Sequence, residues 1–259
     1  MSVAQIGLIS NPNARENRRN PGRVTELASI LGAHGTVIET ASVDDLPAAA
    51  ERLRDSGISY LALNGGDGTN HRTLSAFVEV WGERPLPRLV ILRGGTMNTV
   101  ANGLGVHGTP TRILRGLVER LAADIEPETR QTVLLEARAD DGPRQYGFIF
   151  GSGIVAGFLR AYYDHGDVSP FVAAQTLAAA VGSTIVGGPL AARITARQPF
   201  SVTTDGALWV ERPLISLLAA SVAEIGLGFT PFPRCNERPD AYHAVAIAGE
   251  LLDVVLALP

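Results

Sequence analysis

The feature that most constrains the fold is a pattern repeated in the first half of the chain. An apolar run of strand length is followed by a glycine-rich loop and then by apolar residues at helical spacing. Residues 58–64, ISYLALN, run into GGDGTNH, and residues 89–92, LVIL, run into RGGTMN. Continuous apolar character is typical of strands covered on both faces, as in parallel sheets. The pattern therefore predicts an α/β domain with a mainly parallel sheet.

The same alternation extends from the amino terminus to about residue 125. Asn11-Pro12 closes the first apolar run, and Gly82 closes the helix that follows the first glycine loop. One more helix is expected after the second glycine loop. The other predicted strands lie at residues 5–10 and 35–41, and the other predicted helices at 22–31, 46–57 and 109–125.

The second half of the chain is β-rich. Residues 132–158 are predicted to form a hairpin with its turn at Asp141–Pro143, and further strands flank Asp205-Gly206. A helical insert is predicted near residues 169–186. Because no low-complexity linker separates the halves, we expect two closely packed domains, residues 1–128 and 129–259.

Composition excludes several classes of function. All 22 basic residues are arginines, so mechanisms that need a lysine, such as a Schiff base or a P-loop lysine, are excluded. A net charge of −4 offers no basic field for nucleic acid. Cys235 is the only cysteine, so neither an internal disulfide nor a cysteine-based zinc site is possible. The amino terminus lacks the pattern of a signal peptide, which predicts a cytoplasmic location.

One segment requires a test for membrane insertion. Residues 171–188, FVAAQTLAAAVGSTIVGG, are mostly small and apolar but include Gln175, Thr176, Ser183 and Thr184. A spanning helix needs roughly 20 predominantly apolar residues. We therefore expect a buried or interfacial helix, with contact to a bilayer or an apolar ligand as the alternative.

The two glycine-rich loops are suited to binding phosphate. Loops at the carboxyl ends of neighbouring parallel strands line one crevice, so the two loops can face the same ligand. Glycine brings backbone N–H groups close to phosphate oxygens, and the amino end of a helix adds favourable partial charge. A tight turn is the alternative. The residues concerned are Gly65, Gly66, Gly68, Gly94 and Gly95, with the hydroxyls of Thr69 and Thr96 at equivalent places.

Asp67 is the unusual member of the first loop. A carboxylate repels phosphate unless a cation stands between them or the carboxylate takes a proton from an attacking hydroxyl, and both roles occur in phosphoryl transfer. Aspartate also caps helices well, and Asp67 precedes a predicted helix. Position alone leaves these alternatives open.

The motifs resemble, in order, those of the diacylglycerol kinase catalytic-domain family, which includes bacterial lipid kinases and sphingosine kinases. GGDGT alone is shared with NAD kinases, whereas the ordered set is more specific. In the second half, Asp205-Gly206 and GLGFTPFP at 226–233 resemble the family's lipid-side domain. The matching first-half motifs are Asn11-Pro12, GGDGT at 65–69, Gly95-Thr96-x-Asn98, Ala101 and Leu104-Gly105.

The resemblance implies a Rossmann-like nucleotide-binding domain, a β-sandwich domain on the lipid side, and a nucleotide cleft between them. It also implies ATP and Mg²⁺, with Asp67 as the catalytic residue. Arg15, Arg18, Arg19 and Arg93 are candidates for neutralising phosphate. The residues implied to bind the nucleotide are Asn11, Thr40, Gly65, Gly66, Gly68, Thr69, Gly95, Thr96 and Asn98.

Three departures from the family pattern bear on activity. Thr99 stands where the family has an aspartate after the second-loop asparagine, and Arg72 stands where it has an acidic residue. The family's late Asp-Gly-Glu is not found, because Gly249-Glu250 is interpreted as a turn before a final helix beginning near Leu251. We therefore expect a chain that is truncated at its carboxyl end relative to the family.

The resulting hypothesis is an ATP-dependent phosphotransferase with an alcohol acceptor. Its substrate would be the hydroxyl of a diacylglycerol-like or sphingoid lipid, met peripherally at the inner face of the membrane. A homodimer is left open. The alternatives are an NAD-kinase-like enzyme and a catalytically silent nucleotide- or lipid-binding homologue, which Thr99 and Arg72 favour.

Overall fold

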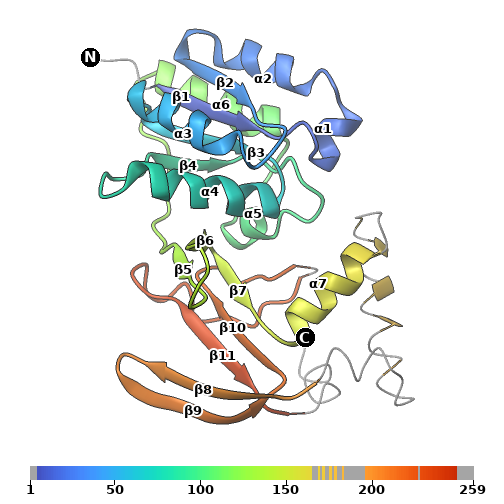
Figure 1. Ribbon diagram of the computed structural model, residues 1–259. Helices are drawn as coiled ribbons and strands as arrows, with labels where there is room; N and C mark the ends of the chain where they lie inside the picture. Colours follow the sequence, from blue (N-terminus) through green and yellow to red (C-terminus); the bar gives the residue numbers. More distant parts are fainter. Residues whose placement is uncertain are drawn as a thin grey trace. The chain divides into compact units, whose positions relative to one another are not determined.

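The computed structural model describes residues 5–164, 196–226 and 228–249, together with isolated positions 169, 171, 172, 175, 176, 178, 179 and 183. The chain divides into two compact units, Met1–Phe148 and Ile149–Pro259. Each unit is described by itself below (Figure 1). The predicted insert near 169–186 and the predicted final helix fall largely or wholly outside the described residues.

The first unit is built on a four-stranded parallel sheet, which confirms the predicted α/β class. Its strand order is β2-β1-β3-β4. Ile6 pairs with Gly35 on one side and with Tyr60 on the other, and the pairing runs in register to the ends of the strands. The strands are β1 (Ile6–Ser10), β2 (Gly35–Glu39), β3 (Tyr60–Asn64) and β4 (Arg88–Ile91).

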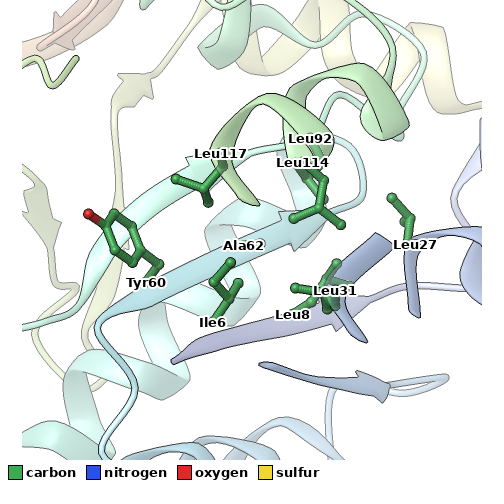
Figure 2. Close-up of a cluster of buried hydrophobic side chains, with 9 residues drawn as sticks. All are labelled: Ile6, Leu8, Leu27, Leu31, Tyr60, Ala62, Leu92, Leu114 and Leu117. Atoms are coloured by element: carbon green, nitrogen blue, oxygen red, sulfur yellow. The ribbon is translucent and has the colours of Figure 1, made fainter. Parts of the chain in front are cut away.

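Helices cover both faces of this sheet (Figure 1). On one face, Leu27 of α2 (Arg23–Leu31) and Leu114 of α6 (Pro110–Ala122) pack on Ile6 and Leu8 of β1, as Figure 2 shows. The other face carries α3 (Leu46–Asp55) and α4 (Asp67–Trp81). Burial of such apolar side chains contributes about 1.5–3 kcal/mol each, so this core fixes the positions of the loops at the strand ends.

Local sequence explains where the helices begin and end. The α2 and α4 helices end at Gly32 and Gly82, which take left-handed conformations with φ of 50° and 59°. Thr109 caps α6 by accepting a hydrogen bond from the N–H of Arg112. Only glycine adopts a positive φ without a steric cost, so Gly32 and Gly82 indicate the ends of α2 and α4 in the sequence. Short α1 (Arg15–Arg19), α5 (Thr99–Gly103) and the 3₁₀ turn η1 (Gly32–His34) complete this part of the unit.

A small hairpin, β5 (Leu135–Ala137) with β6 (Gln145–Gly147), also belongs to the first unit. It is attached to α4, because Ser75 Oγ accepts a hydrogen bond from the N–H of Tyr146 at 2.9 Å. The expected domain boundary after residue 128 therefore differs from the division after Phe148. Residues 132–134, expected to start this hairpin, carry no regular structure.

The second unit has antiparallel strands, as its pattern predicts. A three-stranded sheet has the order β11-β10-β7, and β8 and β9 form a separate hairpin with a bulge between Val202 and Thr203. Phe232 and Leu218 lie in its core. The predicted strand through residue 158 is wrong, because α7 (Ile154–Asp164) begins there. The strands are β7 (Ile149–Gly151), β8 (Gln198–Thr204), β9 (Ala207–Leu214), β10 (Ser216–Ala220) and β11 (His243–Ile247).

None of the helices in the described ranges has the length and apolar character needed to cross a membrane. The segment 171–188, tested above for insertion, lies mostly outside those ranges.

Candidate functional site

The strand order of the first unit places a candidate site at the carboxyl ends of β1 and β3. The chain leaves β1 toward β2 on one side, and β3 then lies on the other side of β1. Such a reversal of strand order opens a crevice outside the carboxyl ends of the strands, which is the usual ligand position in open α/β sheets. The loop that starts at Asn11 and the loop that starts at Gly65 flank this crevice.

Asparagines hold the loop after β1 against the loop after β3. Asn11 Nδ2 donates a hydrogen bond to Thr69 Oγ1 at 2.9 Å, and the N–H of Asn11 donates to the carbonyl of Asn64 at 3.1 Å. Buried Asn17 donates from Nδ2 to the carbonyls of both Asn11 and Asn64, at 2.7 and 3.1 Å. Two predicted nucleotide-binding residues, Asn11 and Thr69, are thereby brought together.

Asn17 and Asn64 were not predicted from the sequence. Asn64 is fully buried and donates from Nδ2 to Ser10 Oγ at 2.9 Å and to Asn17 Oδ1 at 3.1 Å. The signal for Asn64 in the sequence was its place at the end of an otherwise apolar strand. A polar residue there is buried, and a buried amide needs hydrogen-bond partners. Asn17 gave no such signal, since it lies in a polar run, NARENRRN, that has the composition of a surface loop.

The two glycine-rich loops lie in direct contact. A Cβ added to Gly95 would lie 2.2 Å from the Cα of Gly66, and one added to Gly65 would lie 2.4 Å from Cβ of Thr69. A side chain at either position would require the neighbouring backbone or Thr69 to move. The glycines are therefore needed for the close approach of the loops, in addition to any role in binding a ligand.

The amino terminus of α4 is open. Gly66 occupies the capping position and no side chain caps the helix. Gly68 in the first turn is exposed, with no atom within 4 Å of an added Cβ. The first N–H groups of a helix have no partner within the helix, and they carry partial positive charge. This turn is therefore the part of the site best suited to an anion such as phosphate.

The second loop differs, because its own side chains occupy its polar groups. The N–H of Gly95 donates to Asn98 Oδ1 at 3.0 Å, and Asn98 Nδ2 donates to the carbonyl of Gly95 at 3.1 Å. Asn98 has a left-handed backbone with φ 52° and ψ 43°. In this conformation Asn98 stabilises the loop, and the loop lies beside the open first turn of α4.

The half-buried Asp67 links the first loop to the helix that follows the second. Its Oδ2 accepts a hydrogen bond from the N–H of Thr99 and its Oδ1 accepts one from the N–H of Val100, both at 3.0 Å. The carboxylate thus caps α5 rather than α4, the helix in which it lies. Hydrogen bonds between an ionised carboxylate and backbone N–H groups are stronger than neutral ones, so this contact fixes the two loops to each other.

The remaining predicted residues take different positions. Thr40 is buried at the end of β2, where its N–H donates to the carbonyl of Ser10 at 3.0 Å. Thr96 is half-buried in the second loop. Arg93 donates to Asn102 Oδ1 at 2.6 Å and to the carbonyl of Val106 at 2.7 Å, so its guanidinium holds the chain after α5. Exposed Arg19 pairs with Glu16 at 3.7 Å.

The comparison with protein families agrees with this geometry. Residues 5–127 match the model of the diacylglycerol kinase catalytic domain. Over these residues the chain is similar to the diacylglycerol kinase catalytic domain family. The matched range contains the sheet of the first unit and both glycine-rich loops, which makes the unit a kinase-type domain.

Solved structures similar to this chain include three from Bacillus anthracis strain Sterne that are named as diacylglycerol kinases. One has a TM-score of 0.63 at 14% identity, covering 96% of this chain and 77% of its own. The other two, both at 16% identity, have TM-scores of 0.59 and 0.56 and cover 87% and 86% of this chain. This chain covers 67% and 66% of those two. No curated protein matches significantly.

The family implies a nucleotide substrate and a divalent cation. Within the described residues, no group of three or more His, Cys, Asp or Glu side chains is placed to hold a metal. Asp67 is the one carboxylate in the two loops. Mg²⁺ in nucleotide-dependent enzymes is commonly held by one or two carboxylates together with the substrate phosphates. The residues present fit a cation that arrives with a nucleotide, and not one held by a protein cage.

Proposed function

We propose that the protein is an ATP-dependent lipid kinase, which transfers the γ-phosphoryl group of ATP to a hydroxyl of a diacylglycerol-like or sphingoid lipid. The observation that carries the proposal is the open amino terminus of α4, set between Asn11 and Gly95 at the reversal of strand order in a kinase-type domain. The family name supports the lipid acceptor.

In this proposal the phosphates lie at the first turn of α4, where the N–H groups of the turn and the dipole of the helix stabilise their charge. Gly65, Gly66 and Gly68 allow close approach, and Asn11 fixes Thr69 at the edge of the site. Bound Mg²⁺ would supply charge neutralisation of the phosphates. Asp67 lies where it can face that cation while holding the two loops together.

The test is phosphoryl transfer from radiolabelled ATP to a panel of diacylglycerols, sphingoid bases and NAD. We expect a phosphorylated lipid and no NADP. Labelled NADP would favour the NAD-kinase-like alternative. Asp67→Asn should reduce transfer by at least about 100-fold, as loss of a positioned acidic group does in such reactions. Exposed Asp44→Asn is the matched control and should leave transfer unchanged.

One observation favours a catalytically silent homologue as the second candidate. Both carboxylate oxygens of Asp67 already accept hydrogen bonds from α5, which is the arrangement of a structural residue. This candidate predicts that ATP binds, that no acceptor is phosphorylated, and that Asp67→Asn lowers stability alone. Calorimetric titration with ATP beside the transfer assay separates the two candidates.

A further inference from the structure

The side-chain amide of Asn11 has a fixed direction, because a backbone N–H holds one end of it. Asn11 Oδ1 accepts a hydrogen bond from the N–H of Asn13 at 2.8 Å. A backbone N–H can only donate, so the oxygen of the amide lies on that side. Nδ2 is therefore the end that points toward Thr69, and it donates to Thr69 Oγ1 at 2.9 Å. Asn11 presents a donor, and not an acceptor, to the threonine.

This donor determines what the hydroxyl of Thr69 can offer to a ligand. Thr69 is half-buried in the first turn of α4, where the uncapped N–H groups lie. Because Oγ1 already accepts a hydrogen bond from Asn11, the hydrogen of the hydroxyl remains available, and it has no acceptor among the described residues. A hydroxyl without such a donor can turn its hydrogen to the carbonyl four residues earlier, here Gly65. It would then present only lone pairs, which repel phosphate oxygens.

Asn17 holds Asn11 through the backbone. Its Nδ2 donates to the carbonyls of Asn11 and Asn64, at 2.7 and 3.1 Å. Carbonyls can only accept, so the direction of this amide is fixed too, and its Oδ1 accepts from Asn64 Nδ2 at 3.1 Å. Asn64 Nδ2 also donates to Ser10 Oγ at 2.9 Å. The three asparagines thus form one network in which each amide can take only one direction.

Asn17 is placed to act on the site without touching a ligand. Only 4% of its surface is exposed, so the side chain cannot reach a phosphate itself. It lies in α1, a five-residue helix that is too short to be stable alone, so contacts with the rest of the unit set the position of this helix. Besides the bonds of Asn17, the N–H of Glu16 donates to the carbonyl of Gly94 in the second glycine-rich loop at 3.3 Å.

We propose that Asn17 is a positioning residue for phosphate binding, which acts through Asn11 to keep the hydroxyl of Thr69 as a hydrogen-bond donor. This inference rests on the proposed function in one respect, the placement of phosphate at the first turn of α4. Asn17 holds the carbonyl of Asn11, and Asn11 Nδ2 occupies a lone pair of Thr69 Oγ1. The hydrogen of Thr69 is then free to bind a phosphate oxygen of ATP.

A double-mutant cycle on ATP binding separates this role from a general loss of structure. Thr69→Val keeps the shape of the side chain but removes the hydroxyl. We expect it to raise the Kd for ATP with Mg²⁺ about 10–100-fold, as for the loss of a hydrogen bond to a charged group. Asn17→Ala alone should raise the Kd at least about fivefold. In the Thr69→Val background it should change the Kd by less than about twofold, because the group through which Asn17 acts is already absent.

Matched variants control the cycle, which isothermal titration calorimetry of the full chain measures. Thr69→Ser retains the hydroxyl and should bind ATP almost as the wild type does. Asn20→Ala makes the same change at the exposed carboxyl end of α1 and should leave the Kd unchanged. If Asn17→Ala does not fold, Asn17→Ser replaces it in the cycle, since its hydroxyl offers one donor in place of two.

Two results would overturn the inference. One is a wild-type Kd in Thr69→Val, and the other is an equal effect of the Asn17 substitution in both backgrounds. If the wild-type protein binds ATP and the cycle has the expected form but no acceptor is phosphorylated, the proposed function fails and the role of Asn17 stands. If the wild-type protein binds no ATP, both fail.

Discussion

At the scale of single residues, the candidate site depends on close contacts between backbone segments that a side chain would prevent. Gly66 and Gly95 let the two loops touch, and Asn98 accepts a left-handed backbone while bonding both polar groups of Gly95. Asp67 then ties the first loop to α5 through two charge-assisted hydrogen bonds. Each of these residues acts on the backbone of a neighbouring segment.

We expect Gly95→Ala to destabilise the first unit, because its methyl group would lie 2.2 Å from the Cα of Gly66. Overpacking of this kind costs about 1–3 kcal/mol or more. Gly116→Ala is the control, since Gly116 lies within α6 with no atom within 4 Å of an added Cβ. It should raise the unfolding free energy by up to about 1 kcal/mol. Urea unfolding measures both, and equal stabilities would refute the close contact.

At the scale of elements, the sequence predicted the parallel strands and the longer helices, because each has a strong apolar pattern and a glycine or proline at a boundary. The α5 helix is the one expected after the second glycine-rich loop, whereas α1 has only five residues and too few apolar positions for a helical pattern. The hairpin predicted through residue 158 failed where α7 begins, since GIVAGF suits a strand and a helix equally. Contacts with the rest of the unit determine whether such short segments form a strand or a helix.

The residues of the site were easier to predict than their interactions. The glycine loops and Asp67 stand out because glycine, aspartate and threonine cluster at the ends of apolar runs. The pairing of Asp67 with α5 and of Asn98 with Gly95 depends on how two loops meet, which the order of residues does not encode directly. For the same reason Asn17 emerged only from the structure.

The start of α3 provides a test that depends on pH. Asp45 Oδ2 accepts a hydrogen bond from the N–H of Ser42 at 2.8 Å, which lowers the pKa of the carboxyl below its usual value. A lowered pKa in the folded state stabilises the fold above the unfolded pKa, and this contribution is lost as pH falls through the folded pKa. We expect unfolding free energy to fall less between pH 5 and 2 in Asp45→Asn than in wild type. Identical pH dependence would contradict the role of this hydrogen bond.

At the scale of the whole molecule, each unit has a hydrophobic core of its own. Leu8, Leu27 and Leu114 lie in the core of the first unit, whereas Leu218 and Phe232 lie in that of the second. The hairpin β5–β6 belongs with the first unit because α4 holds it through His71 and Ser75. Chain continuity alone does not reveal this assignment, since the hairpin follows a segment without regular structure.

Two fragments test this assignment. Residues 1–148 include the hairpin, and residues 1–128 end before it. Removing the hairpin breaks its hydrogen bonds to His71 and Ser75, and each such bond contributes about 0.5–1.5 kcal/mol. We expect the longer fragment to melt at the higher temperature in circular dichroism. A shorter fragment of equal or greater stability would show that the hairpin contributes nothing to the first unit.

The most direct test of the central claim is to titrate the ¹⁵N-labelled protein with ATP and Mg²⁺ and follow the backbone N–H resonances. We expect the largest shifts at Gly66, Gly68 and Thr69, whose N–H groups surround the open turn of α4. We expect the shifts to saturate with ATP in the wild type and to be smaller in Gly95→Ala. Binding at the first turn of α4 would be refuted if these three resonances did not move while others shifted, for example in the groove lined by Glu26 and Arg115.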